Sequence, residues 1–166
     1  MDGRTLLGPV VTGPTPVSLD EIELHGFADA SSRAYAAAVY LRCTDATGNV
    51  TVRLLVAKTK VAPVKRVSFP RLELCGALLL ARLMRNTATG LGLKSASIFA
   101  WTDAAVVLAW IRSHPARWKT FVAHRVAEVQ TLVPPERWRY VPTTDNPADA
   151  ATRGLSPTKL ANLDLW

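Results

Sequence analysis

The sequence predicts an α/β fold, in which a mixed five-stranded sheet, three antiparallel strands followed by two parallel additions, is flanked by helices. Two observations indicate this class. Strand patterns fill the first part of the chain, and helix and strand patterns alternate after them. The 166 residues, 49% hydrophobic and 20% charged, suffice for one domain with a sizeable core.

We place the boundaries of this domain at residues 21–156. Residues 1–20 hold three prolines and three glycines, which predicts an extended linker. Residues 157–166 follow the last predicted helix and are interpreted as a C-terminal tail.

The first three strands are predicted to be antiparallel. Residues 24–31 and 34–43 are small, aromatic or β-branched and flank a short turn, which indicates a hairpin. A turn at 45–49 leads to a third strand over 50–61, where apolar and polar residues alternate and the end is basic.

A long helix and alternating elements follow. Pro70 suits a first helical position, Ser68 is a candidate cap, and Gly90 ends the predicted helix over 71–89. The same rules predict the later elements: a strand over 97–102, helices over 103–113 and 119–133, a strand over 137–141, and a last helix over 146–153 that Asn146 caps.

The charge balance indicates a polyanionic partner. Twenty Lys and Arg against thirteen Asp and Glu give a net charge of +7. The longest apolar run, 74–81, is too short to cross a membrane, and the N-terminus does not resemble a secretory signal. We therefore expect no membrane contact. Cys43 and Cys75 lack the spacing of a disulfide framework or a zinc site, so we expect a protein of a reducing, intracellular and cytoplasmic setting.

Two stretches without any acid, 46–72 and 104–127, concentrate cations, and the second adds tryptophans and histidines. Cations mixed with stacking rings are typical of surfaces that bind nucleic-acid backbones. A solvated basic surface is an equally good interpretation of these stretches. The candidate nucleic-acid-binding residues are Lys58, Lys60, Lys65, Arg117, Trp118 and Lys119.

Glu73 lies on an apolar face of the long predicted helix, together with Ala77, Leu80, Ala81 and Met84. A glutamate on a core-facing stripe needs a cation or a metal ion beside it. Alternatively, Glu73 is exposed at the start of the helix and interacts favourably with the helix dipole.

Asp29 and Asp103 end two predicted strands with the same layout, an aromatic residue, a spacer, Asp and then Ala. If these strands are parallel neighbours, both carboxylates emerge at one edge of the sheet. Either aspartate alone could form a turn or a cap, and Asp149 in the last helix could simply favour the helix dipole. Four converging carboxylates would repel one another unless Mg²⁺ or Mn²⁺, hard ions that take oxygen ligands, neutralised them.

Four blocks carry a resemblance to a known family. Residues 24–31 (LHGFADAS), 69–74 (FPRLEL), 101–104 (WTDA) and 138–154 (WRYVPTTDNPADAATRG) resemble the ribonuclease H domain of BEL/Pao-type LTR retrotransposon polyproteins. The likeness covers about residues 22–156 and implies a ribonuclease H-like fold. The catalytic, metal-binding acids of the family carry over onto Asp29, Glu73, Asp103 and Asp149.

This resemblance implies an endonuclease that cleaves the RNA strand of RNA/DNA hybrids during retrotransposon reverse transcription. Two Mg²⁺ ions, with Mn²⁺ as an alternative, would support the chemistry. The implied partners are the hybrid and the reverse transcriptase domain of the same polyprotein, in a cytoplasmic virus-like particle. Residues 1–20 would then be a linker from the upstream polyprotein region.

Two departures and two other functions accompany the resemblance. The stretch 113–118 (SHPARW) is too short for the extra basic helix with which some relatives hold the hybrid. Related ribonucleases H usually carry a histidine in the loop before the last helix, but none follows His124, and Thr143, Thr144 and Asp145 are the candidate substitutes. The first alternative function is another metal-dependent nuclease or transferase of the superfamily, such as an integrase core, although that core would carry Glu in place of Asp149. The second is a catalytically inactive or host-captured module that binds nucleic acid or a protein partner.

Overall fold

The computed structural model describes residues 21–93, 96–156, 158–159 and 162. The linker predicted at 1–20 and most of the tail predicted at 157–166 lie outside these residues. The strands are β1 (Ile22–Ala30), β2 (Ala34–Thr44), β3 (Val50–Val61), β4 (Ser97–Thr102) and β5 (Trp138–Tyr140). The helices are α1 (Phe69–Gly90), α2 (Ala105–Ile111), α3 (Thr120–Leu132) and α4 (Ala148–Arg153), with short 3-10 helices η2 (Pro115–Arg117), η3 (Pro135–Arg137) and η4 (Thr143–Asp145).

The predicted mixed sheet is confirmed, with strand order β3-β2-β1-β4-β5. The first three strands pair antiparallel, and β4 and β5 add parallel to β1 and β4. The two strands with the same layout are therefore neighbours, and Phe27 of β1 pairs with Trp101 of β4. Their carboxyl ends meet at one edge of the sheet.

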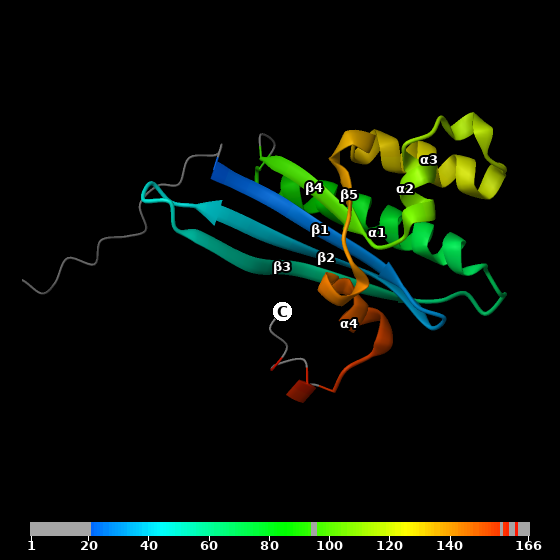
Figure 1. Cartoon of the computed structure of the whole chain (residues 1–166), viewed down its shortest axis with the longest axis horizontal. Coiled ribbons are helices and arrows are strands. Elements are labelled where there is room, and N and C mark those ends of the chain that lie inside the picture. Colours follow the sequence, from blue (N-terminus) through cyan, green and yellow to red (C-terminus); the bar gives the residue numbers. More distant parts are fainter. Residues whose placement is uncertain (1–20, 94–95, 157, 160–161, 163–166) are drawn as a thin grey trace, which may run out of the picture.

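Helices cover the two faces of the sheet unequally. In Figure 1, α1 lies behind the sheet, and α4 lies in front of it. Helices α2 and α3 pack beside α1. A Cβ at Gly26 of β1 would lie 2.5 Å from the side chains of Leu80 and Met84 of α1, so alternate residues of β1 face that helix closely. The buried core lies between α1, α3 and the sheet and includes Leu24, Leu74, Leu80, Met84, Val126 and Trp138.

The ends of several elements differ from the prediction. The helix predicted from Asp103 begins at Ala105, and Ala104 precedes it without a side-chain capping bond. Asp103 makes a different contact, described below. Ser68 likewise precedes α1 without a side-chain capping bond. Pro147 takes the position directly before α4, but the predicted capping contact of Asn146 is present, because Asn146 Oδ1 accepts a hydrogen bond of 3.1 Å from the backbone N–H of Ala148. Within the residues that the structure describes, no helix is both long and apolar enough to span a membrane.

Candidate active site

Three carboxylates converge at the carboxyl ends of β1 and β4. Asp29 is near the end of β1, Asp103 directly follows β4, and Glu73 projects from the first turns of α1. One carboxylate oxygen from each lies within 4.8 Å of the other two. The parallel register of β1 and β4 explains the first pair, and the close packing of α1 on β1 brings the third acid beside them.

Burial distinguishes these acids from surface carboxylates. Asp29 and Glu73 are 3% and 5% exposed. Glu73 Oε2 and Asp103 Oδ1 are buried and have no hydrogen-bond partner among the described residues. A buried polar atom without a partner is costly, so these oxygens are suited to a ligand that supplies the missing interaction.

Asp149 lies near the three acids without joining their cluster. It lines a cleft of about 280 Å³ together with Asp29, Glu73 and Asp103. Its Oδ1 atom accepts a hydrogen bond of 2.8 Å from Arg153 Nε, one turn later in α4. The structure therefore places all four predicted acids around one cleft and brings three of them together.

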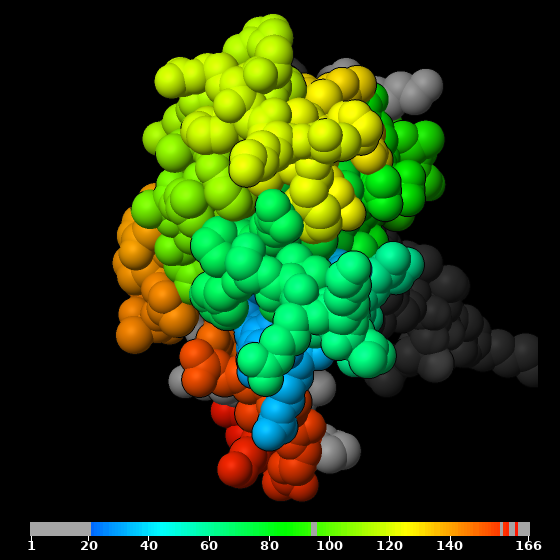
Figure 2. Space-filling model, turned by 90° about the vertical axis from the view of Figure 1, so that its right-hand side faces the viewer, coloured from blue at the N-terminus to red at the C-terminus, as the bar shows by residue number. Residues whose placement is uncertain are grey.

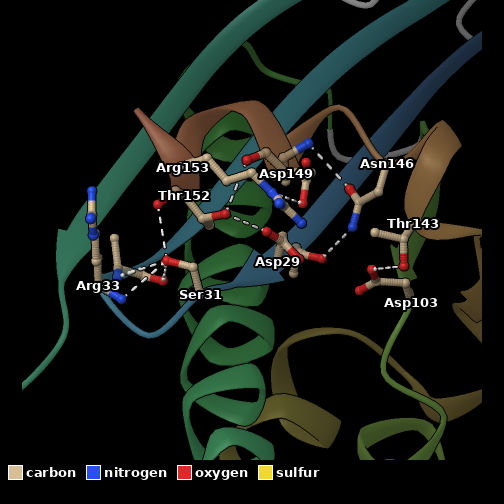
Figure 3. Close-up of polar contacts among 12 residues, drawn as sticks. Asp29, Ser31, Arg33, Asp103, Thr143, Asn146, Asp149, Thr152 and Arg153 are labelled. Atoms are coloured by element: carbon tan, nitrogen blue, oxygen red, sulfur yellow. Dashed lines mark hydrogen bonds and ion pairs between the residues drawn. The ribbon is translucent and has the colours of Figure 1, made fainter. Parts of the chain in front are cut away.

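The segment before and within α4 binds the ends of the two central strands (Figure 3). Thr152 Oγ1 donates a hydrogen bond of 2.5 Å to Asp29 Oδ2, and Thr143 Oγ1 donates one of 2.7 Å to Asp103 Oδ2. Asn146 Nδ2 donates a bond of 3.0 Å to the carbonyl oxygen of Ala28. The sequence carries no signal for this role of Thr152, and it indicates Thr143 only as a substitute for the loop histidine.

The space-filling view looks onto this end of the molecule. The blue turn after β1, the green segment leading into α1 and the orange-to-red C-terminal segments come together there (Figure 2). Phe69, at the start of α1, lines the cleft and is 55% exposed. The acids are thus accessible from one side through an open cleft.

Burial and mutual repulsion raise the pKa of two of the acids. Burial raises the pKa of Glu73 to about 8, and the charges of Asp29 and Asp103 add to the effect. Burial also raises the pKa of Asp29 to about 6, although the hydrogen bond from Thr152 opposes the shift. Near neutral pH, burial and repulsion therefore oppose the charged forms of these carboxylates, and the nearby Arg153 does not fully compensate.

The donor set fits a divalent cation. All the converging ligand atoms are carboxylate oxygens, which Mg²⁺ and Mn²⁺ prefer. In the part of the chain that the structure describes, none of Asp29, Glu73 and Asp103 forms an ion pair. Arg153, which also lines the cleft, is paired with Asp149, and its charge interacts with Asp29 and Asp103 only from a longer distance. A cation bound among these carboxylates would neutralise their charge and would interact with Glu73 Oε2 and Asp103 Oδ1, which are buried and have no partner among the described residues.

The candidate nucleic-acid-binding residues are spread over several elements. Lys58 and Lys60 are exposed on β3, and Lys65 is exposed in the segment before α1. Arg117 and Lys119 are exposed between α2 and α3. None of these cations lines the cleft of the acids.

Trp118 differs from the neighbouring cations because it is half-buried. Its ring packs against Trp110 with the centroids 6.2 Å apart, and the guanidinium of Arg117 lies 5.9 Å from the centroid of its ring. Its indole nitrogen is buried without a hydrogen-bond partner among the described residues. The sequence favours Trp118 as a stacking residue for nucleic acid, whereas in the structure its half-buried side chain packs against the core.

The family model of the Pao retrotransposon-like RNaseH-like domain matches residues 12–104. The chain belongs to this family. The matched stretch contains Asp29, Glu73 and Asp103, and the resemblance inferred from the four sequence blocks is confirmed. Asp149 and β5 lie beyond the matched stretch.

Solved structures share the fold. The N-terminal RNase H domain of a Mycobacterium tuberculosis protein aligns with a TM-score of 0.54 and 19% identity, over 80% of this chain and 91% of that one. LC11-RNase H1, isolated from compost by a metagenomic approach, aligns with a TM-score of 0.51 and 12% identity, over 85% and 99%. No curated protein matches the chain in sequence. The predicted ribonuclease H-like fold of this Pao-family domain is therefore confirmed.

Proposed function

We propose that this Pao-family domain is a metal-dependent endonuclease that cleaves the RNA strand of RNA/DNA hybrids during retrotransposon reverse transcription. One observation carries the proposal, namely the convergence of Asp29, Glu73 and Asp103 within 4.8 Å in an open cleft. Family membership supports the ribonuclease H chemistry.

Asp29, Glu73 and Asp103 would hold the divalent cations, with Asp149 contributing from α4. When bound there, two Mg²⁺ or Mn²⁺ ions would supply activation of the attacking water and stabilisation of the leaving 3′ oxygen. The chain itself supplies rigid placement, because the acids are fixed to two paired strands and a helix packed on them. Without cations, the same carboxylates would repel the phosphates of the substrate, so cleavage should depend fully on metal.

The substrate would be held by its backbone and its sugars. We propose that Lys58, Lys60, Lys65, Arg117 and Lys119 contact phosphates, and that Trp118 supports Arg117 by packing beneath it. A hybrid is distinguished from DNA by the 2′-hydroxyls of its RNA strand. Sequence preference should therefore be weak. The reverse transcriptase domain of the same polyprotein, in a cytoplasmic virus-like particle, is the proposed setting of the reaction.

The decisive experiment is cleavage of an end-labelled RNA/DNA hybrid in Mg²⁺, with single-stranded RNA and duplex DNA of the same sequence as controls. We expect hybrid-specific cutting that EDTA abolishes and that Asp29→Asn, Glu73→Gln and Asp103→Asn each abolish. Glu136→Gln makes the same chemical change at an exposed position and should cut normally.

Three results would contradict the proposal. Cutting in EDTA, or full cutting by any of the three acid variants, would exclude the metal site as the catalytic centre. Hybrid binding without cutting would instead favour the inactive binding module. Cutting of duplex DNA in preference to hybrid would favour another nuclease of the superfamily.

A further inference from the structure

We infer that Thr143 and Thr152 are positioning residues, whose hydroxyl groups fix the two strand-end aspartates in the orientation that binds a divalent cation. The inference rests on the proposed function of the same cleft and adds to it. Two threonines of one C-terminal segment bond the two aspartates that end β1 and β4 (Figure 3).

Thr152 is buried and is hydrogen-bonded to the end of β1 and to the turn after it. Its side chain is 3% exposed, and its Oγ1 atom lies 2.5 Å from Asp29 Oδ2. Its carbonyl oxygen accepts a hydrogen bond of 3.0 Å from Ser31 Oγ, in the turn that follows β1. The hydroxyl and the carboxylate that it contacts are therefore both anchored at the same end of β1.

Thr143 is anchored on both sides by neighbouring residues. The backbone N–H of Val141 donates to the carbonyl oxygen of Thr102 in β4 at 3.1 Å. On the other side, Asn146 donates to the carbonyl oxygen of Ala28 in β1. The segment that carries Thr143 is thus attached to both β4 and β1. This attachment holds the Thr143 hydroxyl 2.7 Å from Asp103 Oδ2.

The two hydroxyls leave the site with a defined set of free oxygens. Each aspartate has one oxygen bonded to a threonine, and the second oxygen of Asp103, Oδ1, is buried without a partner among the described residues. Because like charges repel, carboxylates within 4.8 Å of one another tend to turn apart, and the threonine bonds oppose this movement at Asp29 and Asp103. The backbone of Ala30 also bonds Asp29, whereas Thr143 is the only hydrogen-bond partner of the Asp103 side chain among the described residues. Hydrogen bonds to metal ligands typically change metal affinity by about 10- to 100-fold.

A local role for Thr152 must be separated from this positioning role. Its Oγ1 atom also lies 3.0 Å from the carbonyl oxygen of Asp149, three residues earlier in α4. Thr131 makes a similar local contact in α3, where its hydroxyl donates to the carbonyl oxygen of Ala127 at 2.9 Å. Thr131→Val therefore removes a local helix contact without touching the cleft and is the matched control.

The test is the affinity for Mn²⁺, measured by isothermal titration calorimetry on the whole chain without nucleic acid. We expect Thr143→Val and Thr152→Val each to weaken the affinity by about 10- to 100-fold. Thr143→Ser and Thr152→Ser keep the hydroxyl and should stay close to wild type, as should Thr131→Val. Thermal melting of each variant in EDTA reports whether the fold itself is intact.

Several outcomes would overturn the inference. Unchanged Mn²⁺ affinity in folded valine variants, or equal losses in the serine variants, would show that the hydroxyls do not position the aspartates. Should Thr152→Val fail to fold, Thr143→Val, at an exposed position, decides alone. Absence of Mn²⁺ binding in the wild type would refute the proposed function as well, whereas wild-type binding with unaffected variants would refute only the inference.

Discussion

Gly76 of α1 lies against the backbone of Asp29, and a Cβ at position 76 would lie 2.9 Å from the Asp29 carbonyl oxygen. Gly76 follows Glu73 by three residues, so the two positions share a face of the helix. The absence of a side chain at 76 therefore allows the close approach that places the Glu73 carboxylate beside that of Asp29.

We expect Gly76→Ala to lower the free energy of unfolding by about 1 to 3 kcal/mol, because a backbone oxygen cannot move aside as a side chain can. Alanine ordinarily stabilises a helix interior relative to glycine by up to about 1 kcal/mol. Gly90→Ala, in the same helix with nothing within 4 Å of its added Cβ, should be neutral or stabilising. Urea unfolding followed by circular dichroism compares the two, and equal stabilities would contradict the packing argument.

The metal-free protein should lose stability as the pH rises from about 5 to 8. Because the pKa of Glu73 is raised to about 8 and that of Asp29 to about 6, the folded protein binds more protons than the unfolded chain in this range. The free energy of unfolding then falls with rising pH, and the stabilisation is lost as the pH passes the folded-state pKa values.

Urea unfolding in EDTA at pH 5, 6, 7 and 8 measures this dependence. Glu73→Gln should flatten it and be more stable than wild type at pH 8, and Mg²⁺ should offset the loss in wild type. The exposed Glu136→Gln is the control and should keep the wild-type slope. Asp29 should leave a residual slope below about pH 6. A full wild-type slope between pH 6 and 8 in Glu73→Gln would mean that another group causes the pH dependence in that range.

Asp149→Asn should weaken Mn²⁺ binding less than Asp103→Asn does. Asp149 lies outside the cluster of three acids, and its Oδ1 atom is already bonded to Arg153. Asp103 belongs to the cluster and has a buried oxygen with no partner among the described residues. Calorimetric titration of both variants tests the order, and equal losses of affinity would indicate that Asp149 is a full member of the cation site.

Hybrid binding should depend on salt through the exposed cations between α2 and α3. Each phosphate contact contributes roughly 0.9 to the slope of log affinity against log salt on B-DNA, and we expect a similar value for a hybrid. Replacing both Arg117 and Lys119 by alanine should therefore reduce the magnitude of the slope by about 2. Binding is measured in EDTA to prevent cleavage, with the exposed Arg85→Ala as control. An unchanged slope would identify this segment as ordinary solvated surface.

Much of the acidic cluster could be predicted because it depends on periodicity and strand order. Asp29 and Asp103 end strands of the same layout, and their pairing follows from the predicted parallel addition of β4 to β1. Glu73 could be assigned because an acid on an apolar helical face requires a partner. These signals lie within single elements or in their order along the chain.

The threonine contacts and the packing of Trp118 could not be predicted in the same way. Thr143 and Thr152 reach their aspartates only because the last segment crosses the ends of both strands. The residue types in that segment do not indicate the path that it takes. A tryptophan among cations looks the same whether its ring binds nucleic acid or packs inward, as Trp118 does. Tertiary contacts decide both cases.

The bonds from Asn146 to Ala28 and from Thr152 to Asp29 join residues 118 and 123 positions apart. Contacts of such separation require the ordering of a long intervening loop, whereas β1 and β2 pair as immediate neighbours. We expect the antiparallel half of the sheet to form first and the acidic cleft to be completed last during folding. Brief detachment of the six-residue α4 would then disassemble the cleft in an otherwise folded protein. The rate of amide hydrogen exchange in α4 would therefore report how often the cleft is open and unable to bind cations.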